Sequence, residues 1–171
     1  MRRGRLVAID GVDLAAVRAA ARDAIREMNV PRGGVSHWDA SGVFHELGLV
    51  NGDASPRTLL LLYAADLAFR VRWEIAPALA EGRTVVAAPY VATAIAFGRA
   101  VGLPSEWLTN LLAFAPRHTE ARIVDPGRAA STRPSGFVGV ACERWAAHAG
   151  VDRRGLTREM ARHLRPRRAR R

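Results

Sequence analysis

The start of the chain places a short apolar run directly before an amphipathic helix, and this order constrains the fold more than any other feature. The run Arg5–Ile9 (RLVAI) is followed by Asp10-Gly11, which predicts a buried strand. From about Leu14 to Met28, apolar residues recur at helical spacing while arginines lie on another face, which predicts an amphipathic helix. A strand followed by a helix is the opening unit of an α/β protein.

The best-defined element is a long helix in the middle of the chain. Ser55 is predicted to be its N-cap, because a proline follows at the first helical position. We expect the helix to run to about Glu81, with Gly82 as its stop and Pro77 kinking or tightening its last turns. The segment Leu59–Ala65 is apolar all round, so we expect a central helix that is buried on every side.

The remaining elements are predicted from shorter patterns. We expect a parallel core strand at 83–88, helices at 91–101 and 106–114, the second of them capped by Ser105, and further helices at 137–149 and 156–164. A short strand within 31–37, a short helix at 42–47 and a weak strand at 120–124 complete the pattern. The length fits one domain, which we assign to residues 1–164, followed by a disordered arginine-rich tail at 165–171.

The positive charge of the chain comes from arginine alone. All 26 basic residues are arginines, so no reaction that needs a lysine ammonium group can use this chain's own residues. Residues 151–171 contain nine arginines against Asp152 and Glu159, and therefore supply +7 of the total net charge of +10. Such a segment is typical of contact with nucleic-acid phosphates or an acidic protein surface, although a solvated tail would have the same composition.

Composition excludes several classes of protein. No apolar run approaches the roughly 20 residues that span a bilayer, and acidic residues at positions 10 and 13 follow the basic N-terminus too closely for a signal peptide, so we expect a cytoplasmic protein without membrane contact. The lone Cys142 excludes an internal disulfide and a multi-cysteine zinc site, and its apolar neighbours predict a buried thiol. His37, Asp39 and His45 lack a recognised ligand spacing, so no metal site is predicted.

The order of these elements and several stretches of sequence resemble the thymidylate kinase family. The clearest stretch is Leu59–Leu108 (LLLLYAADLAFRVRWEIAPALAEGRTVVAAPYVATAIAFGRAVGLPSEWL), which is similar to the family's long helix, the following strand and the next two helices. Arg5–Asp13 (RLVAIDGVD) looks like the family's first strand and the start of its phosphate loop. The resemblance covers residues 5–115. It implies an α/β fold of the P-loop NTPase type, a three-layer parallel sheet with helices on both faces.

The phosphate loop is where the sequence departs most from this family. A P-loop needs glycines that let its backbone close around phosphates, a lysine that reaches the transferred phosphate, and a hydroxyl for Mg²⁺. Gly11 is retained, but Leu14 and Ala16 stand where two glycines are expected. Val17 occupies the position of the lysine and Arg18 that of the hydroxyl. Side chains at the two former glycines obstruct the approach of a phosphate to the backbone.

Two acidic residues flank this loop. Asp10 and Asp13 together offer carboxylates for a cation, but Asp13 directly precedes the predicted helix and is more simply its N-cap. In either case the loop Asp10–Arg18 is a degenerate phosphate site.

Other parts of the family's phosphate-transfer machinery are also missing. The Asp-Arg-Tyr or Asp-Arg-His signature after the third strand corresponds here to Ala88-Pro89-Tyr90, so its carboxylate and its arginine are absent. The family arginine that contacts the acceptor nucleotide corresponds to Leu67, and Arg128 and Arg133 are the only lid-like arginines. Each missing donor typically costs about two to three orders of magnitude in rate. We therefore predict no catalytic residues and expect neither ATP nor Mg²⁺ as a cofactor.

Part of the family's base pocket is retained. Tyr63 matches the ring that stacks on thymine, Phe97 matches a second pocket aromatic, and Tyr90 remains from the lost signature. These rings form either a residual base-sized slot or core aromatics that fill the vacated cleft. Asp66 and Arg70 border the slot and are spaced as a simple ion pair along one helix.

Three hypotheses about function follow. The first is a catalytically inactive thymidylate kinase-like protein with a binding or regulatory role toward an unidentified protein partner. The second is a nucleoside- or nucleotide-binding protein, or a kinase with atypical phosphate chemistry through Arg18, Arg70 or Arg99, which predicts weak binding of a nucleoside or dTMP. The third is a nucleic-acid-associated protein that makes nonspecific contacts through Arg165–Arg171. The resemblance also implies a homodimer, with Phe69 and Trp73 as candidate interface residues, although burial in the core would explain these two equally well.

Overall fold

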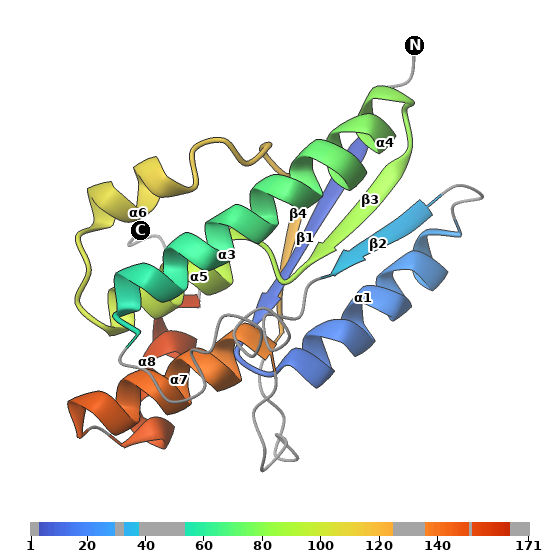
Figure 1. Cartoon of the computed structure of the whole chain (residues 1–171). Helices are drawn as coiled ribbons and strands as arrows, with labels where there is room; N and C mark the ends of the chain where they lie inside the picture. The colour runs from blue at the N-terminus through green and yellow to red at the C-terminus, as the bar shows by residue number, and fades with distance from the viewer. Residues whose placement is uncertain (1–3, 30–32, 38–53, 125–135, 151, 165–171) are drawn as a thin grey trace, which may run out of the picture.

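Four parallel strands form the centre of the molecule in a computed structural model that describes residues 4–29, 33–37, 54–124, 136–150 and 152–164 (Figure 1). The strand order is β2-β3-β1-β4. Val7 of β1 lies opposite Val86 of β3 on one side and Glu120 of β4 on the other. The strand bounds are Arg5–Gly11 for β1, Gly33–His37 for β2, Thr84–Ala88 for β3 and Glu120–Val124 for β4. All four predicted strands are therefore present.

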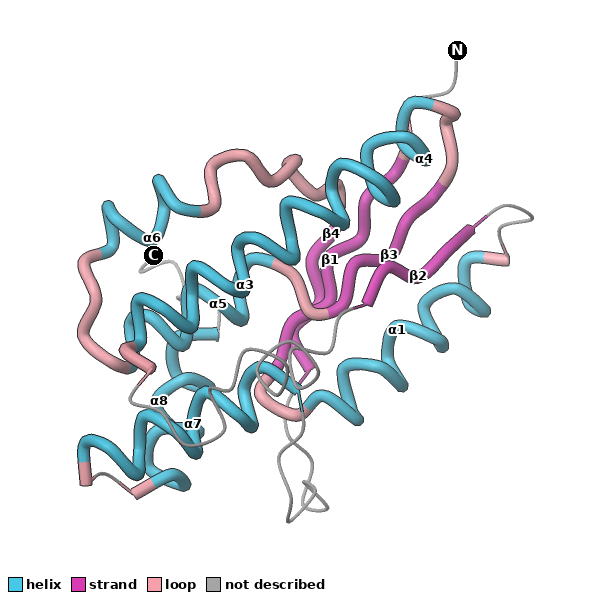
Figure 2. Tube along the Cα trace, in the orientation of Figure 1, coloured by secondary structure: helices cyan, strands magenta, loops and turns pink. Residues whose placement is uncertain are grey.

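Helices cover both faces of this sheet, as Figure 2 shows. Side chains alternate between the faces along each strand. Val7, Ile9 and Val86 pack against Val17 and other residues of α1 (Leu14–Met28) on one face. Leu6 and Ala8, with their neighbours on β3, form the larger core under the remaining helices on the other face. The predicted three-layer α/β architecture is thus confirmed.

The long helix is one continuous helical run with a change of hydrogen bonding inside it. It consists of α3 (Pro56–Arg70), five residues of π-helix in η1 (Val71–Ile75), and α4 (Ala76–Ala80). The Ser55 side chain accepts a hydrogen bond from the Thr58 amide at 3.1 Å, so the predicted N-cap is confirmed. Pro77 has no N–H to give to the preceding turn, which is consistent with looser π-type bonding just before it. Gly82 ends the run with φ of 73°.

The prediction that this helix is buried on every side is wrong. Leu61, Phe69 and Trp73 expose 53%, 61% and 64% of their surface, and we call these three residues the exposed apolar stripe. Leu59, Leu60, Tyr63, Ala64, Leu67 and Arg70 are buried. The helix lies in an outer layer, where only one side meets the sheet and the neighbouring helices (Figure 1). An apolar sequence therefore leaves an apolar surface on its other side.

Four further helices complete the described structure. They are α5 (Val91–Ala100), α6 (Ser105–Leu111), α7 (Gly136–Ala149) and α8 (Arg153–Leu164). The predicted cap at Ser105 is wrong, because Ser105 is the first helical residue, Pro104 holds the cap position, and no side chain bonds there. The predicted helix at 42–47 and the tail at 165–171 lie outside the described residues. No described helix combines the length and apolarity that crossing a membrane requires.

Candidate functional site

The candidate site lies at the carboxyl ends of the strands, where ligands of open α/β sheets usually bind. Only two residues separate the end of β1 from the start of α1. The second of them, Asp13, is the N-cap of α1, and its carboxylate accepts a hydrogen bond from the Ala16 amide at 3.0 Å. Free amides at a helix N-terminus are what binds an anion such as phosphate. Here the chain's own carboxylate takes up one of these amides, so the predicted capping role of Asp13 is confirmed.

Apolar side chains fill the space next to this helix N-terminus. Val17, which we predicted to match the family's lysine, is buried against Gly11, where an added Cβ atom would lie 2.8 Å from Val17 Cγ2. Leu14, which we predicted to match a family glycine, packs against Gly136 at the start of α7, where an added Cβ would lie 2.4 Å from Leu14 Cδ2. Gly11 is therefore retained beside packed side chains and not beside an open phosphate cradle.

A second set of hydrogen bonds closes the site from the side of β3 and α5. Asp10 is buried, and one of its carboxylate oxygens accepts hydrogen bonds from the Tyr90 amide at 2.8 Å, the Thr93 amide at 2.9 Å and the Thr93 hydroxyl at 2.7 Å. Burial raises the pKa of Asp10, and the hydrogen bonds from Thr93 and Tyr90 oppose this rise. The Gly11 amide donates to Thr93 Oγ1 at 3.2 Å. Asp10 therefore holds the start of α5 against the end of β1.

The Arg70 side chain is used in a similar structural way. It is 2% exposed, and its guanidinium donates to Ser36 Oγ at 2.9 Å, to the Ser36 carbonyl at 2.7 Å and to the Pro89 carbonyl at 3.3 Å. These bonds connect the long helix to the carboxyl ends of β2 and β3. Its distance to Asp66 Oδ2 is 3.8 Å, so the predicted ion pair is long.

Asp66 stands at the edge of this cluster with little polar support. Its Oδ2 atom is buried and has no hydrogen-bond partner in the part of the chain that the structure describes. Burial raises the pKa of Asp66 to about 7, Arg70 lowers it, and Glu74 adds to the rise.

The aromatic residues of the predicted base pocket come together, but with a third ring between them. Phe137 of α7 lies 4.7 Å from Tyr63 and 5.4 Å from Phe97, measured between ring centroids. All three rings are buried. The Tyr63 hydroxyl donates to the Tyr90 carbonyl, and the Tyr90 hydroxyl donates to the Pro116 carbonyl at 2.7 Å. Burial raises the pKa of Tyr90 to about 12, so both phenols act as neutral hydrogen-bond donors.

The other predicted residues lie apart from this cluster or outside the described residues. Arg18 is half-buried on α1, and Arg99 is exposed near the carboxyl end of α5.

Cys142 is buried with its sulfur 3.8 Å from the Met160 sulfur, and burial raises its thiol pKa to about 12, which fits the predicted inert thiol. Arg128, Arg133, Asp39 and His45 are not described. Among the described residues, no three His, Cys, Asp or Glu side chains are grouped as a metal site would require.

Sequence reasoning missed three residues that shape this site. The role of Thr93 could have been predicted, because it lies three residues after Tyr90 in the first turn of a helix that follows a core strand. The roles of Ser36 and Phe137 could not, since their partners are 34 and 74 positions away along the chain and only the fold brings them together.

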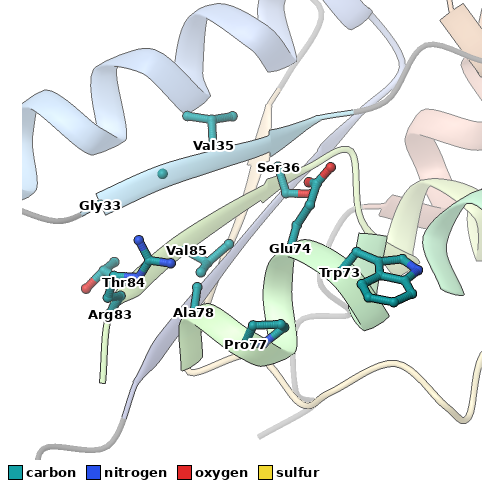
Figure 3. Close-up of a pocket in the computed structure, with 11 residues that line it drawn as sticks. Gly33, Val35, Ser36, Trp73, Glu74, Pro77, Ala78, Arg83, Thr84 and Val85 are labelled. Carbon is teal, nitrogen blue, oxygen red and sulfur yellow. The ribbon is translucent and has the colours of Figure 1, made fainter. Parts of the chain in front are cut away.

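A shallow groove of about 320 Å³ lies elsewhere, between β2, β3 and the π-helical segment (Figure 3). Figure 3 shows Trp73, Pro77 and Ala78 on the helical segment and Val85 on β3, while the Val35 side chain points from β2 away from that segment. The groove begins at the first residues of both strands, Gly33 and Thr84, so it lies mainly toward the amino ends of the strands. It is therefore not a remnant of a nucleotide site at the carboxyl ends.

The architecture and the position of the β1–α1 loop define an α/β protein of the P-loop NTPase type. No family model matches the sequence. The chain is 30% identical over 123 residues to a probable thymidylate kinase of Pyrobaculum calidifontis, covering 70% of this chain and 63% of that protein. It is 54% identical over 57 residues to a thymidylate kinase of Desulfosudis oleivorans, covering 33% of this chain and 27% of that protein.

A structural comparison agrees with these relatives. The fold matches a crystal structure of thymidylate kinase from Ehrlichia chaffeensis with a TM-score of 0.59 at 15% identity, over 95% of this chain and 98% of that one. The chain is thus similar to thymidylate kinases in sequence over 70% of its length, and its fold matches that of a thymidylate kinase structure. It spans less than two thirds of the length of the curated relatives that it matches.

Proposed function

We propose that this chain is a catalytically inactive thymidylate kinase-like protein with a binding or regulatory role. The observation that carries the proposal is the self-filled phosphate loop. The Asp13 carboxylate takes an amide at the N-terminus of α1, and Val17 packs into the core at the position of the lysine. ATP and Mg²⁺ do not fit these residues, since a carboxylate and apolar side chains stand where cationic and hydroxyl groups would be needed.

The size of the loss supports inactivity. Phosphoryl transfer depends mostly on positioning and on neutralising charge, and the groups that perform both are replaced here. The buried Arg70 is engaged with Ser36 and Pro89. An atypical phosphate chemistry through Arg70 would require breaking buried, charge-assisted hydrogen bonds, which are worth about 1.5–3 kcal/mol each.

The aromatic cluster weighs against the nucleoside-binding alternative. Phe137 contacts both rings of the predicted slot, and all three are buried. A base could stack on Tyr63 only if Phe137 and the start of α7 moved away. This arrangement supports the interpretation that the rings fill a vacated cleft.

The exposed apolar stripe supports a role in binding another protein. Leu61, Phe69 and Trp73 lie at spacings of eight and four residues along one helical run, and the rings of Phe69 and Trp73 are 6.5 Å apart. Large apolar side chains that gather on one surface mark interaction sites more often than single ones do. The homodimer remains part of this proposal, because a two-fold axis would place the same stripe of two chains face to face.

Enzyme assay and calorimetry on the same preparation test the proposal. We expect no dTMP phosphorylation above that of a mock purification, and no heat of binding with ATP–Mg²⁺, dTMP or thymidine at millimolar ligand. A thymidylate kinase assayed in parallel confirms that the conditions support activity.

An Arg18→Gln variant serves as the control for contamination. Activity that is equal in wild type and variant, and that separates from the protein on a second column, comes from a contaminant. Phosphorylation that co-purifies with the chain and falls in the variant would overturn the proposal of inactivity. Binding of dTMP or thymidine without ATP binding would instead favour the nucleoside-binding alternative.

A further inference from the structure

The last described helix, α8, has one apolar side and one strongly basic side. Leu156, Met160 and Leu164 are buried in the core, at four-residue spacing. Arg154, Arg158 and Arg162 repeat at the same spacing, and all three are exposed. We call these three residues the α8 arginine face. Four residues of an α-helix rise about 6 Å, so this face presents three guanidinium groups along about 12 Å.

Nearby acidic residues neutralise little of the positive charge of the α8 arginine face, so these arginines can still bind an anion. Arg158 lies 3.8 Å from Asp152, and Arg162 lies 2.7 Å from Glu159, while Arg154 makes no ion pair in the part of the chain that the structure describes. Asp152 is exposed and Glu159 is partly exposed, and ion pairs in contact with solvent are weak, typically about 0–1 kcal/mol. A guanidinium has five N–H donors, so each paired arginine keeps donors for a second anion.

We propose that the α8 arginine face binds the phosphate backbone of duplex nucleic acid without reading its sequence. Duplex DNA carries about one negative charge per 1.7 Å of its axis, so 12 Å of duplex presents about seven phosphates to three arginines. Arginine suits this contact because its planar fork can bond two phosphate oxygens at once. The five arginines within 165–171 follow directly in the sequence and add charge of the same sign.

Two features of α8 favour a duplex over other polyanions. The helix contains no Phe, Tyr or Trp, so it offers no ring on which bases of a single strand could stack. Its apolar side is already buried, so it cannot insert that side into a lipid bilayer as an interfacial amphipathic helix does. The surface that α8 offers to a partner is therefore the row of guanidinium groups of the α8 arginine face.

Fluorescence anisotropy with a labelled 20-base-pair duplex, titrated with the full chain at several salt concentrations, tests this proposal. The variant is R154Q/R158Q/R162Q, which keeps good helix formers on an exposed surface. We expect at least tenfold weaker binding at about 100 mM salt. We also expect the slope of log K against log salt to fall by about 2.7, since each phosphate contact contributes about 0.9.

The matched control is R22Q/R26Q/R117Q, which removes the same charge from three other exposed arginines. The affinity of this control for the duplex should stay within about twofold of wild type. Its slope of log K against log salt should stay within about one unit of wild type. Equal losses in both variants would mean that only net charge matters, and would overturn the proposal. A truncation after Leu164 that abolishes binding while the α8 variant binds like wild type would also overturn it. So would α8-dependent binding to vesicles containing phosphatidylserine in the absence of duplex binding.

Discussion

At the scale of single residues, the candidate site contains ionisable side chains that are buried in the protein interior. Asp10 and Arg70 are both buried, yet each finds hydrogen-bond partners on neighbouring elements. Buried charges persist in proteins only when they are paired in this way. Asp66 is the exception, because its Oδ2 atom has no hydrogen-bond partner among the described residues and Arg70 is 3.8 Å away.

The first prediction concerns the pH dependence of stability at Asp66. Its folded-state pKa of about 7 lies above the value of 3.8 expected for the unfolded chain. The unfolded chain therefore loses its proton first, and the stability that Asp66 contributes below about pH 4 is lost as the pH rises through 7. Asp66→Asn cannot ionise, so we expect it to be more stable than wild type at pH 8 by about 1–2 kcal/mol. This range discounts the full linkage value for partial solvent access.

Urea unfolding of both proteins at pH 5 and pH 8 checks this prediction. The advantage of Asp66→Asn should grow with pH. Asp23→Asn, which removes an exposed carboxylate from α1, controls for the change in net charge. An advantage of equal size at both pH values would contradict the pKa of about 7.

At the scale of elements, the β1–α1 unit has a short connection in which a carboxylate caps the helix. The helix begins at Leu14, directly after its cap, and the Val17 amide already bonds the Asp13 carbonyl at 2.9 Å. Backbone groups that a phosphate loop would direct at its ligand are thus part of regular helix. Packing of Val17 and Leu14 then fixes this shortened connection in place.

The second prediction tests the cap that occupies this helix end. Asp13→Ala removes the bond to the Ala16 amide and the favourable carboxylate at the positive end of the helix dipole. We expect a loss of about 1 kcal/mol in the free energy of unfolding, measured by urea denaturation. Asp23→Ala on the exposed side of the same helix should change it by less than about 0.5 kcal/mol. Equal stability of the two variants would show that Asp13 does not act as the cap.

At the scale of the whole molecule, the exposed apolar stripe is a surface that no other part of the described chain covers. Its three residues belong to α3 and η1, and each exposes more than half of its surface. Trp73 also borders the groove beside β2, so stripe and groove are continuous. Burying a large apolar side chain of this stripe in a protein–protein contact would favour association by up to about 1.5–3 kcal/mol.

The third prediction is that this stripe mediates self-association. Sedimentation velocity at tens of micromolar should show a dimer for wild type and a monomer for Trp73→Glu, because a charge in the contact would lose its hydration. Phe114→Glu, at another exposed ring, should remain dimeric. A wild-type chain that stays monomeric at all concentrations would reject the dimer and leave a different protein as the partner of the stripe.

Local patterns in the sequence predicted the order and type of the described strands and α-helices, but not the π-helical segment Val71–Ile75. The caps at Asp13 and Ser55 and the buried strand β1 were readable from neighbouring residues. The predicted loss of phosphate chemistry also rests on single positions, with Leu14, Ala16 and Val17 standing where the resemblance implies two glycines and a lysine.

Contacts between distant segments of the chain set which side chains surround Tyr63 and Arg70. Phe137 between Tyr63 and Phe97, and Ser36 beneath Arg70, are contacts between distant segments, and no local pattern encodes them. The tertiary structure also decided that the long helix has an exposed side, because an apolar sequence on every face does not say which face meets the sheet. Burial is a property of the assembled layers, and it depends on which neighbours the fold supplies.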